Sequence, residues 1–382
     1  MSGECRIPLA DADLGPRELR AVSDVVESGR LALGPNLAAF ESAMADYVGV
    51  EHVVAVNSGT SALHLILEGL GIGEGDEVIT TSFSFIASAN CILFVRATPV
   101  FVDIDPNTLC IDPEKIEAAI TPRTKAILAV DVFGHPADWP ALERIAAKHR
   151  LVLIEDSAES LGSELNGRRC GSFGRAGIFG FYPNKQITTG EGGMIVTDDG
   201  ELARVCRSMA NQGRGEGGDW LKHVRLGYNF RMDELSAALG VVQLSRIEEF
   251  IEARNRVASW YESAFADVAE VRTPTLAKNA KNSWFVYVVR LSEEFTAVER
   301  DAVLYELTQQ GIGCRNYFAP IHLQPFYRES HGTREGSLPI TEAVGARTIA
   351  LPFFNRLSRD QVDRVAGSLV GAIDRVREVK RD

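Results

Sequence analysis

VVAVNSGTSALHLILEGL, residues 53–70, places a short apolar run directly before a turn and a helical pattern. In 61–70 the apolar residues recur at helical spacing up to Gly71. Similar apolar runs alternate with helical patterns up to about residue 200. They are EVITT (77–81), TPVFVD (98–103), AILAVDV (126–132), LVLIED (151–156), GIFGFY (177–182) and GMIVT (193–197). Because these runs are apolar throughout, they predict strands buried on both faces, and hence an α/β fold with a mainly parallel seven-stranded sheet flanked by helices.

The pattern changes after Asn229. A long helical pattern covers 233–268, a strand is predicted at 284–291, and further helical patterns follow. We therefore predict a large domain at residues 1–248, which includes the N-terminal segment, and a smaller C-terminal α+β domain at 249–382.

Composition excludes several classes of protein. The formal net charge of −12 argues against general nucleic-acid binding, which needs clustered cations. No apolar run is long enough to span a membrane, and the N-terminus lacks the features of a signal peptide, so we expect a soluble cytoplasmic protein. The six cysteines form no C-x-x-C pair, so neither a disulfide framework nor a metal site is indicated, and most should be small buried side chains.

Polar residues follow three of the predicted strands, at the sheet edge where ligands collect in open α/β folds. After 53–57, Ser58, Gly59, Thr60 and Ser61 open a helix, whose free N–H groups, hydroxyls and positive dipole end suit a phosphate. The segment has neither the P-loop nor the dinucleotide fingerprint. An ordinary helix N-cap is the alternative interpretation.

The other two strand ends hold an acid and a lysine. LVLIEDSAES (151–160) ends its apolar run in Glu155 and Asp156. A carboxylate buried at a strand end needs a cation or a protonated nitrogen as its partner. The alternative is that Asp156 only caps a following helix. FYPNKQITTGEGG (181–193) places Lys185 after two aromatic residues and before a glycine-rich return that lets backbone pack closely. A lysine in a partly apolar pocket loses its proton readily and attacks carbonyl carbons; a solvated surface lysine is the alternative.

Together the three ends match the needs of pyridoxal phosphate. The helix start would anchor the phosphate, the acid would keep the pyridine nitrogen protonated, and the lysine would hold the aldehyde. SFSFIASAN (82–90) adds Phe83 and Phe85 as rings that could stack on the pyridine.

At this point the chain resembles a known family, the DegT/DnrJ/EryC1/StrS sugar-nucleotide aminotransferases, which are fold type I pyridoxal phosphate enzymes, and within it the perosamine synthase-like members. The resemblance covers nearly the whole chain in the same order and spacing. It rests on SGRLALGP (28–35), NSGTSALHL (57–65), SFSFIASAN (82–90), FGHPAD (133–138), EDSAESLGSELNGRRCGSFG (155–174), FYPNKQITTGEGG (181–193), GYNFRMDELSAALGVVQL (227–244) and YFAPIHLQP (317–325).

The resemblance implies roles around the cofactor ring. Lys185 would be the catalytic Schiff-base lysine, and Asp156 would pair with the pyridine nitrogen. Phe85 would stack on the ring, and Glu159 would lie beside the 3-hydroxyl.

The resemblance also implies how the phosphate is bound. Gly59, Thr60 and Ser61 would form the phosphate cup. Asn229 would reach the phosphate from the partner subunit, which implies a homodimer with shared active sites.

Substrate contacts are implied for Arg231, His322 and Arg30. The last of these departs from the family, because Arg30 replaces a common tryptophan and Ala32 a common threonine. Gly180 also departs, since it stands where the family usually has a phosphate-binding serine.

The implied reaction moves an amino group from an amino acid, most often L-glutamate, to a nucleotide-linked ketosugar, with pyridoxamine 5'-phosphate as the intermediate form of the cofactor. The perosamine synthase-like motifs favour a 4-keto-6-deoxy sugar, in polysaccharide or antibiotic biosynthesis. A 3-ketosugar or cyclitol aminotransferase and a non-catalytic regulatory protein on the same fold are the alternatives. A dehydrase of this scaffold has histidine in place of the lysine, so Lys185 favours amine transfer. A nucleotide-binding domain would leave both Lys185 and Asp156 unexplained.

Overall fold

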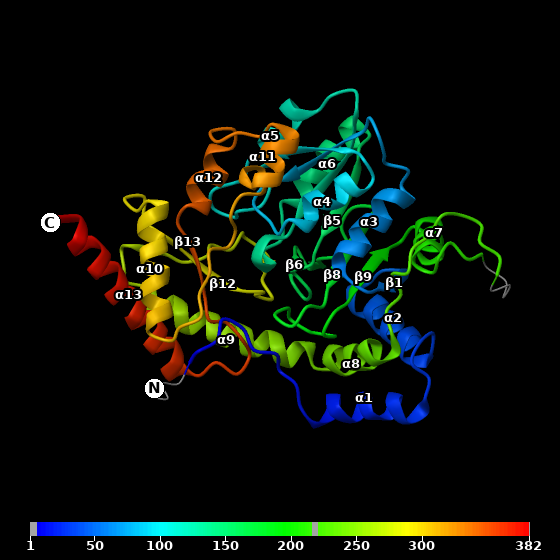
Figure 1. The fold of residues 1–382 in the computed structure, drawn as a ribbon, viewed down its shortest axis with the longest axis horizontal. Coiled ribbons are helices and arrows are strands. Elements are labelled where there is room, and N and C mark those ends of the chain that lie inside the picture. The colour runs from blue at the N-terminus through cyan, green and yellow to red at the C-terminus, as the bar shows by residue number, and fades with distance from the viewer. Residues whose placement is uncertain (1–5, 216–220, 382) are drawn as a thin grey trace.

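A seven-stranded sheet lies at the centre of the computed structural model, which describes residues 6–215 and 221–381 (Figure 1). In the order in which they pair, the strands are β1 (His52–Val56), β9 (Gly193–Thr197), β8 (Ala176–Gly180), β5 (Val152–Asp156), β4 (Thr124–Val130), β2 (Glu77–Thr81) and β3 (Thr98–Val102). The pairs from β8 to β3 are parallel, whereas β9 runs antiparallel to both of its neighbours. The seven predicted strands and their mainly parallel arrangement are confirmed.

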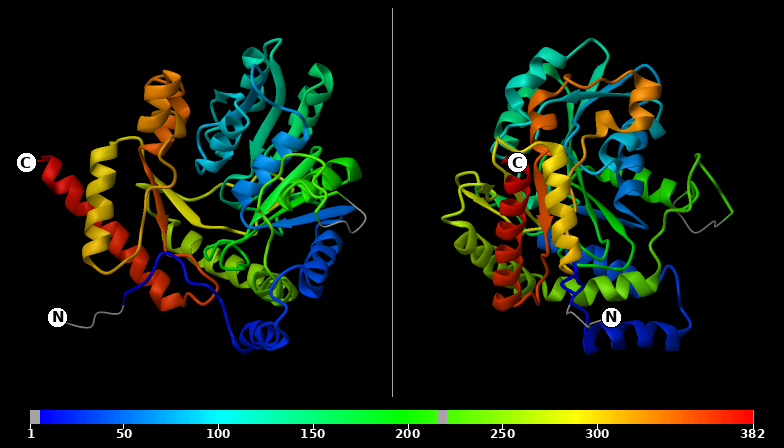
Figure 2. Two further views of the ribbon diagram at one scale, coloured as in Figure 1. Left: turned by 45° about the vertical axis from the view of Figure 1, so that its right-hand side comes forward. Right: turned by 60° about the vertical axis from the view of Figure 1, so that its left-hand side comes forward.

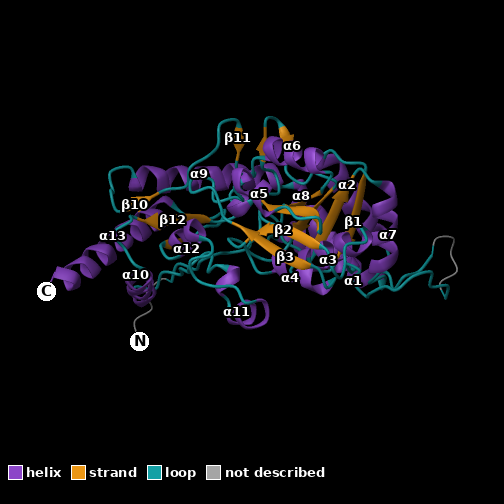
Figure 3. Ribbon diagram, turned by 90° about the horizontal axis from the view of Figure 1, so that it is seen from above, coloured by secondary structure: helices purple, strands orange, loops and turns teal. Residues whose placement is uncertain are grey.

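Helices cover both faces of this sheet, which explains why its strands are apolar on both sides. One face carries α3 (Gly59–Gly69), α4 (Ala87–Phe94) and α7 (Gly200–Ala210), and the other carries α2 (Pro35–Val48), α5 (Pro113–Ala119), α6 (Trp139–His149) and α8 (Glu234–Ser245) (Figure 3). All side chains of β2 and β9 are buried. The parallel strands therefore present their carboxyl ends at one edge, where the polar residues predicted for the site converge.

A smaller α+β unit follows and lies on the side of the molecule where the described chain begins and ends (Figures 1 and 2). Its sheet has the order β10-β12-β13 and packs with α9 and α13 around a hydrophobic core of its own. The elements after α8 are α9 (Ile247–Phe265), β10 (Val271–Arg272), β11 (Ala280–Lys281), β12 (Tyr287–Leu291), α10 (Ala297–Gln309), α11 (Pro325–His331), α12 (Pro339–Gly345), β13 (Thr348–Leu351) and α13 (Arg359–Arg381). A three-stranded sheet of β11, β6 (Glu164–Leu165) and β7 (Arg168–Arg169) was not predicted.

The long helical pattern predicted at 233–268 forms two helices rather than one. Helix α8 ends before Arg246, whose φ of −109° and ψ of 5° are not helical. The Arg246 guanidinium donates to Glu18 at 2.8 Å and to Asp13 at 3.3 Å, in the segment around α1 (Pro16–Ser28), which packs on α8. These tertiary contacts override the local helical pattern. The break lies beside the predicted domain boundary at 248/249, which itself stays a prediction.

Two segments connect the units across that boundary. Ile7 pairs with Ile312 and is buried in the core of the small unit, although the N-terminal segment was predicted to belong to the large domain. Helix α12 begins against the large unit, where the Asp103 carboxylate accepts the N–H of Thr341 at 2.7 Å. The C-terminal third of the chain is therefore held against the large sheet on the side of the predicted site.

The structure bears on two expectations from composition, a membrane span and the cysteines. Among the described residues, no helix is both long and apolar enough to cross a membrane. The described cysteines are all buried, as expected, and Cys5 lies outside the described residues. They are Cys91, Cys110, Cys170, Cys206 and Cys314.

Candidate active site

A cavity of about 610 Å³ opens at the carboxyl ends of β5 and β8, beside the first turn of α3. Its volume is in the range of small-molecule sites, about 300–1,000 Å³. The predicted residues that line it are Gly59, Thr60, Phe85, Asp156, Glu159 and Lys185. The fold thus gathers into one cavity side chains that lie up to 126 positions apart in the sequence, from Gly59 to Lys185.

The first turn of α3 forms one wall of the cavity. Ser58 is the N-cap, and its hydroxyl accepts the N–H of Ser61 at 3.1 Å. The Ser61 hydroxyl donates to Asn57 at 2.7 Å, and Ser61 is not among the residues that line the cavity. The N-cap interpretation is therefore confirmed. It is compatible with anion binding, because the N–H groups of Gly59 and Thr60 have no acceptor inside the helix.

The glycine-rich return brings β9 against this turn. A Cβ at Gly193 would overlap the carbonyl carbon of Ser58 and the amide nitrogen of Gly59, so only glycine fits there. At Gly180, by contrast, the nearest atom to an added Cβ is the Cβ of Ala158 at 3.6 Å, which is ordinary contact. Gly193 is therefore required by close backbone approach, and Gly180 is not.

Asp156 ends β5 in a buried position, 4% exposed, and the next element along the chain is the strand β6, so Asp156 is not a helix cap. Its carboxylate accepts from the Ser88 hydroxyl at 2.7 Å and from the N–H of Ala158 at 3.2 Å. Burial raises the pKa of Asp156, although these hydrogen bonds and the charge of Lys185 oppose the rise. Among the described residues no cation is hydrogen-bonded to this carboxylate, so a protonated ring nitrogen would supply the partner that a buried carboxylate requires.

Lys185 lies in the same cavity, and its side chain is 14% exposed. Its Nζ is 3.6 Å from Oε1 of Glu159 and 3.8 Å from the ring centre of Phe285. Burial lowers the pKa of Lys185, and the carboxylates of Glu159 and Asp156 oppose this effect. The amine is therefore unprotonated in a larger fraction of molecules than a surface lysine would be, as a nucleophile or base requires. The surface interpretation of Lys185 is wrong.

The Glu159 carboxylate, next to the Lys185 amine, is held in place by a main-chain hydrogen bond. Its Oε2 accepts the N–H of Phe133 at 2.9 Å, and its side chain is 6% exposed. Burial raises the pKa of Glu159, and the nearby charge of Lys185 opposes this. The carboxyl group is thus held in one orientation, with its other oxygen toward Nζ.

The two candidate stacking rings have different environments. Phe83 is fully buried and packs edge-on against Phe133 and Phe318 at centroid distances of 5.8 and 5.9 Å. Phe85 is 60% exposed and lines the cavity. Phe85 is therefore the ring available to a ligand.

These groups fit pyridoxal phosphate. The cavity joins free helix N–H groups, a buried carboxylate without a cation bonded to it, an exposed aromatic ring and an amine of lowered pKa. The model of the "DegT/DnrJ/EryC1/StrS aminotransferase family" matches residues 12–370. The chain belongs to this family.

Relatives of this aminotransferase are similar over nearly their whole length. The GDP-perosamine synthase of Caulobacter vibrioides is 41% identical over 376 residues, which cover 97% of this chain and 99% of that protein. The spore coat polysaccharide biosynthesis protein SpsC of Bacillus subtilis is 39% identical over 362 residues, covering 92% and 93%. The sugar aminotransferase Spr1654 of Streptococcus pneumoniae, solved in its PLP form, superposes with a TM-score of 0.93 at 29% identity, covering 97% and 100%. The protein is a fold type I, pyridoxal phosphate-dependent aminotransferase, as predicted.

Asn229 and Arg231 of this aminotransferase lie beside the end of β1 but do not line the cavity of their own chain. The carbonyl of the intervening Phe230 accepts the N–H of Asn57 at 2.8 Å. Asn229 is exposed, and Arg231 donates to the side chain of Asn211 at 2.9 Å. Their roles at a partner's phosphate and at the substrate stay predictions.

His322 and Arg30 are also outside the cavity lining. The His322 ring is 1% exposed and engaged at both nitrogens, with Ser82 at 2.7 Å and Glu342 at 3.0 Å. Arg30 is exposed and donates to the carbonyl of Leu33 at 2.8 Å. In this chain the contacts of His322 hold the 321–323 turn on the large sheet, and direct substrate contact by either residue stays a prediction.

Sequence reasoning missed three residues at the site. Ser88 is one helical turn after Phe85 and orients Asp156. Asn184, next to Lys185, lines the cavity, and its buried Oδ1 has no hydrogen-bond partner among the described residues. Phe285 has no local signal, because its chain segment is brought to the lysine only by the fold.

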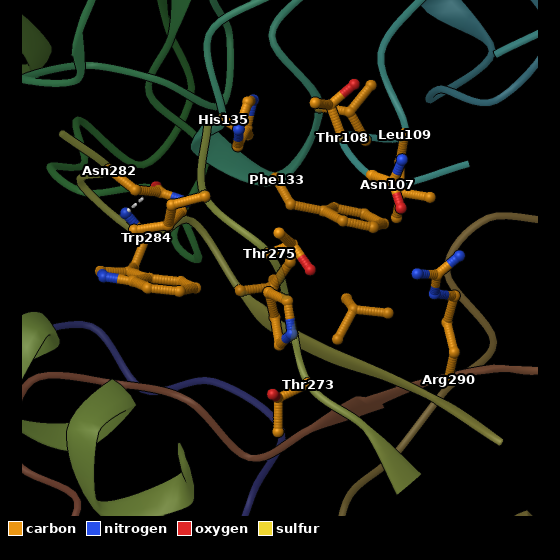
Figure 4. Close-up of a pocket in the computed structure, with 15 residues that line it drawn as sticks. Asn107, Thr108, Leu109, Phe133, His135, Thr273, Thr275, Asn282, Trp284 and Arg290 are labelled. Atoms are coloured by element: carbon orange, nitrogen blue, oxygen red, sulfur yellow. Dashed lines mark hydrogen bonds between the residues drawn. The ribbon is translucent and has the colours of Figure 1, made fainter. Parts of the chain in front are cut away.

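A second hollow lies near the cavity, around Phe133, Trp284 and Asn282 (Figure 4). Its volume is about 30 Å³, enough for one or two water molecules but not for a cofactor. Trp284 and Val286 line this hollow, while Phe285 between them lines the large cavity.

A buried acidic cluster lies below the site. Potential ligand atoms of Asp131, Glu155 and Cys170 lie within 4.8 Å of one another. The single proton of the Ser157 hydroxyl is shared by contacts to Asp131 at 3.0 Å and to Glu155 at 2.7 Å. Burial and the neighbouring Asp131 raise the pKa of Glu155 well above its ordinary value. Glu155 therefore keeps its proton to a higher pH than an exposed glutamate does.

Proposed function

We propose that this aminotransferase transfers an amino group from L-glutamate to a nucleotide-linked 4-keto-6-deoxy sugar. The observation that carries the proposal is the placement of Lys185, Asp156 and the first turn of α3 in one cavity. The 41% identity to a GDP-perosamine synthase over nearly the whole chain supports the choice of acceptor.

Pyridoxal phosphate, when bound, supplies an aldehyde that carries the amino group and a ring that accepts electrons. Lys185 provides the amine that holds it. Once free, Nζ provides a base that moves a proton, because burial lowers its pKa. Glu159 orients Nζ through the contact at 3.6 Å. The main-chain N–H of Phe133 keeps that carboxylate in place.

Asp156 would hold a proton on the ring nitrogen, and Ser88 and Ala158 orient its carboxylate for this task. Phe85 would cover a face of the ring. Gly59 and Thr60 would bind the phosphate with their N–H groups.

We also infer a homodimer in which Asn229 reaches the site of the second copy. Large apolar side chains are exposed on α1 and on the 221–226 segment, including Leu19 at 70% and Leu226 at 75%. A second copy would cover such side chains. If the sites are shared, dilution should weaken cofactor binding and dimerisation together, and a fully active monomer would contradict the inference.

The acceptor is tested by incubating the purified enzyme with L-glutamate and a panel of nucleotide-linked 3- and 4-ketosugars and cyclitol ketones. We expect 2-oxoglutarate to form fastest with a 4-keto-6-deoxy sugar, and the Lys185→Ala variant to form none. A faster reaction with a 3-ketosugar or a cyclitol ketone would overturn the choice of acceptor while leaving amine transfer intact. Equal activity of Lys185→Ala would overturn the role of the lysine.

A further inference from the structure

Arg254, on α9, is a buried cation that is held mainly by main-chain groups. Its side chain is 3% exposed, and it forms no ion pair with any described residue. Burial lowers its pKa to about 10, so the guanidinium is still protonated at neutral pH. A buried charge needs strong hydrogen-bond acceptors to compensate for the water it has lost.

Those acceptors are three main-chain carbonyls that converge from two distant segments. Nη1 donates to the carbonyls of Trp284 at 2.9 Å and of Phe285 at 3.1 Å. Nη2 donates to the carbonyl of Lys185 at 3.1 Å. A protonated guanidinium makes such bonds stronger than neutral ones and directs them with its planar fork.

The two segments are the ones that meet at the amine. The Nζ of Lys185 lies 3.8 Å from the ring centre of Phe285. The 284–285 segment also needs support, because Trp284 has a φ of 56°, which a bulky residue rarely adopts. The side chain of Asn282 accepts the N–H of Trp284 at 2.7 Å on the side of the small hollow, as the dashed line in Figure 4 shows.

We propose that Arg254 is the positioning residue for Lys185, because its guanidinium holds the main chain of the lysine and that of Phe285 together. Arg254 lies outside the cavity lining and so acts through the lysine. The proposal rests on the proposed function in one respect, namely that Lys185 is the residue to which the cofactor attaches.

Comparing two forms of the cofactor distinguishes an effect of a substitution on the position of Lys185 from an effect on the stability of the whole protein. Only pyridoxal phosphate can condense with Nζ, which forms a C=N bond and releases one water. Pyridoxamine 5'-phosphate has the same ring and phosphate but cannot attach. The ratio of their affinities for the cofactor-free protein, measured by equilibrium dialysis, therefore reports how well the amine is presented.

We expect the wild type to prefer the aldehyde form and Lys185→Ala to lose this preference. Arg254→Met should lower the affinity ratio at least about tenfold, since misplacing a reacting group by about 1 Å can cost up to about a hundredfold. Arg254→Lys should fall between wild type and Arg254→Met, because an ammonium keeps the charge but lacks the fork that reaches three carbonyls.

Arg300 offers a matched control. It is also buried, 7% exposed, and donates to main-chain carbonyls, those of Gly345 at 3.0 Å and Thr348 at 3.5 Å, as well as to the exposed Asp301 carboxylate at 2.7 Å. The residues that provide these acceptors do not line the cavity, unlike Lys185 and Phe285. Arg300→Met should lower the thermal midpoint of the protein and leave the affinity ratio unchanged.

An Arg254→Met protein with the wild-type ratio, or with both affinities weakened equally, overturns the proposal. If Arg254→Met does not fold by circular dichroism, Arg254→Lys decides, and an unchanged ratio in that variant overturns it. If wild type and Lys185→Ala bind both forms alike, it is the attachment at Lys185 in the proposed function that fails.

Discussion

Gly180 offers a test of where the phosphate binds. It ends β8 and lines the cavity next to Gly59, since a Cβ on Gly59 would lie 3.5 Å from the Cα of Gly180. A Cβ on Gly180 would meet only that of Ala158 at 3.6 Å, and its φ is not positive, so Gly180→Ser introduces no strain. The new hydroxyl can donate to a phosphate oxygen. A hydrogen bond to a charged group contributes about 1.5–3 kcal/mol, so at the lower end the affinity should rise about tenfold.

Gly180→Ala is the matched control, because it adds the Cβ without the hydroxyl. The dissociation constant of pyridoxal phosphate, measured by equilibrium dialysis on cofactor-free protein, should fall about tenfold for Gly180→Ser and stay near the wild-type value for Gly180→Ala. Equal constants for the two variants would refute the placement of the phosphate between α3 and β8. Gly193→Ser serves as a contrast, since its Cβ would overlap Ser58 and disrupt the same wall.

Three further predictions concern titratable groups. Ser88→Ala removes the 2.7 Å hydrogen bond to Asp156, which lowers the Asp156 pKa, so the pKa should rise further in this variant. The acidic pH at which pyridoxal phosphate affinity falls, measured by dialysis across pH, should move up with it; an unchanged pH would contradict the role of Ser88. Burial lowers the pKa of Lys185, so pyridoxal phosphate should attach to it faster as pH rises, and the rate should level off below the ordinary lysine pKa of about 10.4. The rate is measured at each pH from the visible absorbance of the attached cofactor, and a midpoint of the rate–pH curve at or above that value would contradict the prediction. The raised pKa of Glu155 beside Asp131 means that the folded state binds more protons than the unfolded state above the ordinary glutamate pKa. Stability to urea should therefore fall as pH rises through the folded-state pKa, and Glu155→Gln should reduce that slope by up to about 1.4 kcal/mol per pH unit.

The strands of the large sheet could be predicted because each is a continuous apolar run, a local signal of burial on both faces. The break at Arg246 could not be predicted, because it depends on Asp13 and Glu18, more than 200 positions away in the sequence. The same holds for Asp103 at the start of α12, where a strand-end acid binds a helix that follows far along the chain. The local sequence pattern therefore predicts elements that are buried on all sides, such as these strands. Polar contacts between distant residues decide where helices such as α8 and α12 begin or end.

The candidate site divides in the same way. Lys185, Asp156 and the turn at 58–60 could be predicted, because strand ends in such a sheet share one edge. Ser88, Phe285 and Arg254 could not, because a hydroxyl, a ring and an arginine at those positions look like ordinary helix or core residues. What each of them contributes is the orientation of a predicted residue, and orientation depends on the three-dimensional packing.

The charges in the cavity indicate which kind of ligand it can hold. Asp156 and Glu159 are buried, and burial raises both of their pKa values while it lowers that of Lys185. A purely anionic ligand, such as a nucleotide alone, would meet the helix N-terminus favourably but would leave both acids facing negative charge on a chain that already carries a net charge of −12. A ligand with a phosphate next to the first turn of α3 and a protonated nitrogen next to Asp156 would place a favourable charge at both the helix N-terminus and the carboxylate. It also stabilises the ionised carboxylate, which shifts the Asp156 pKa back down, so cofactor binding should release a proton from this group when binding starts from the protonated acid.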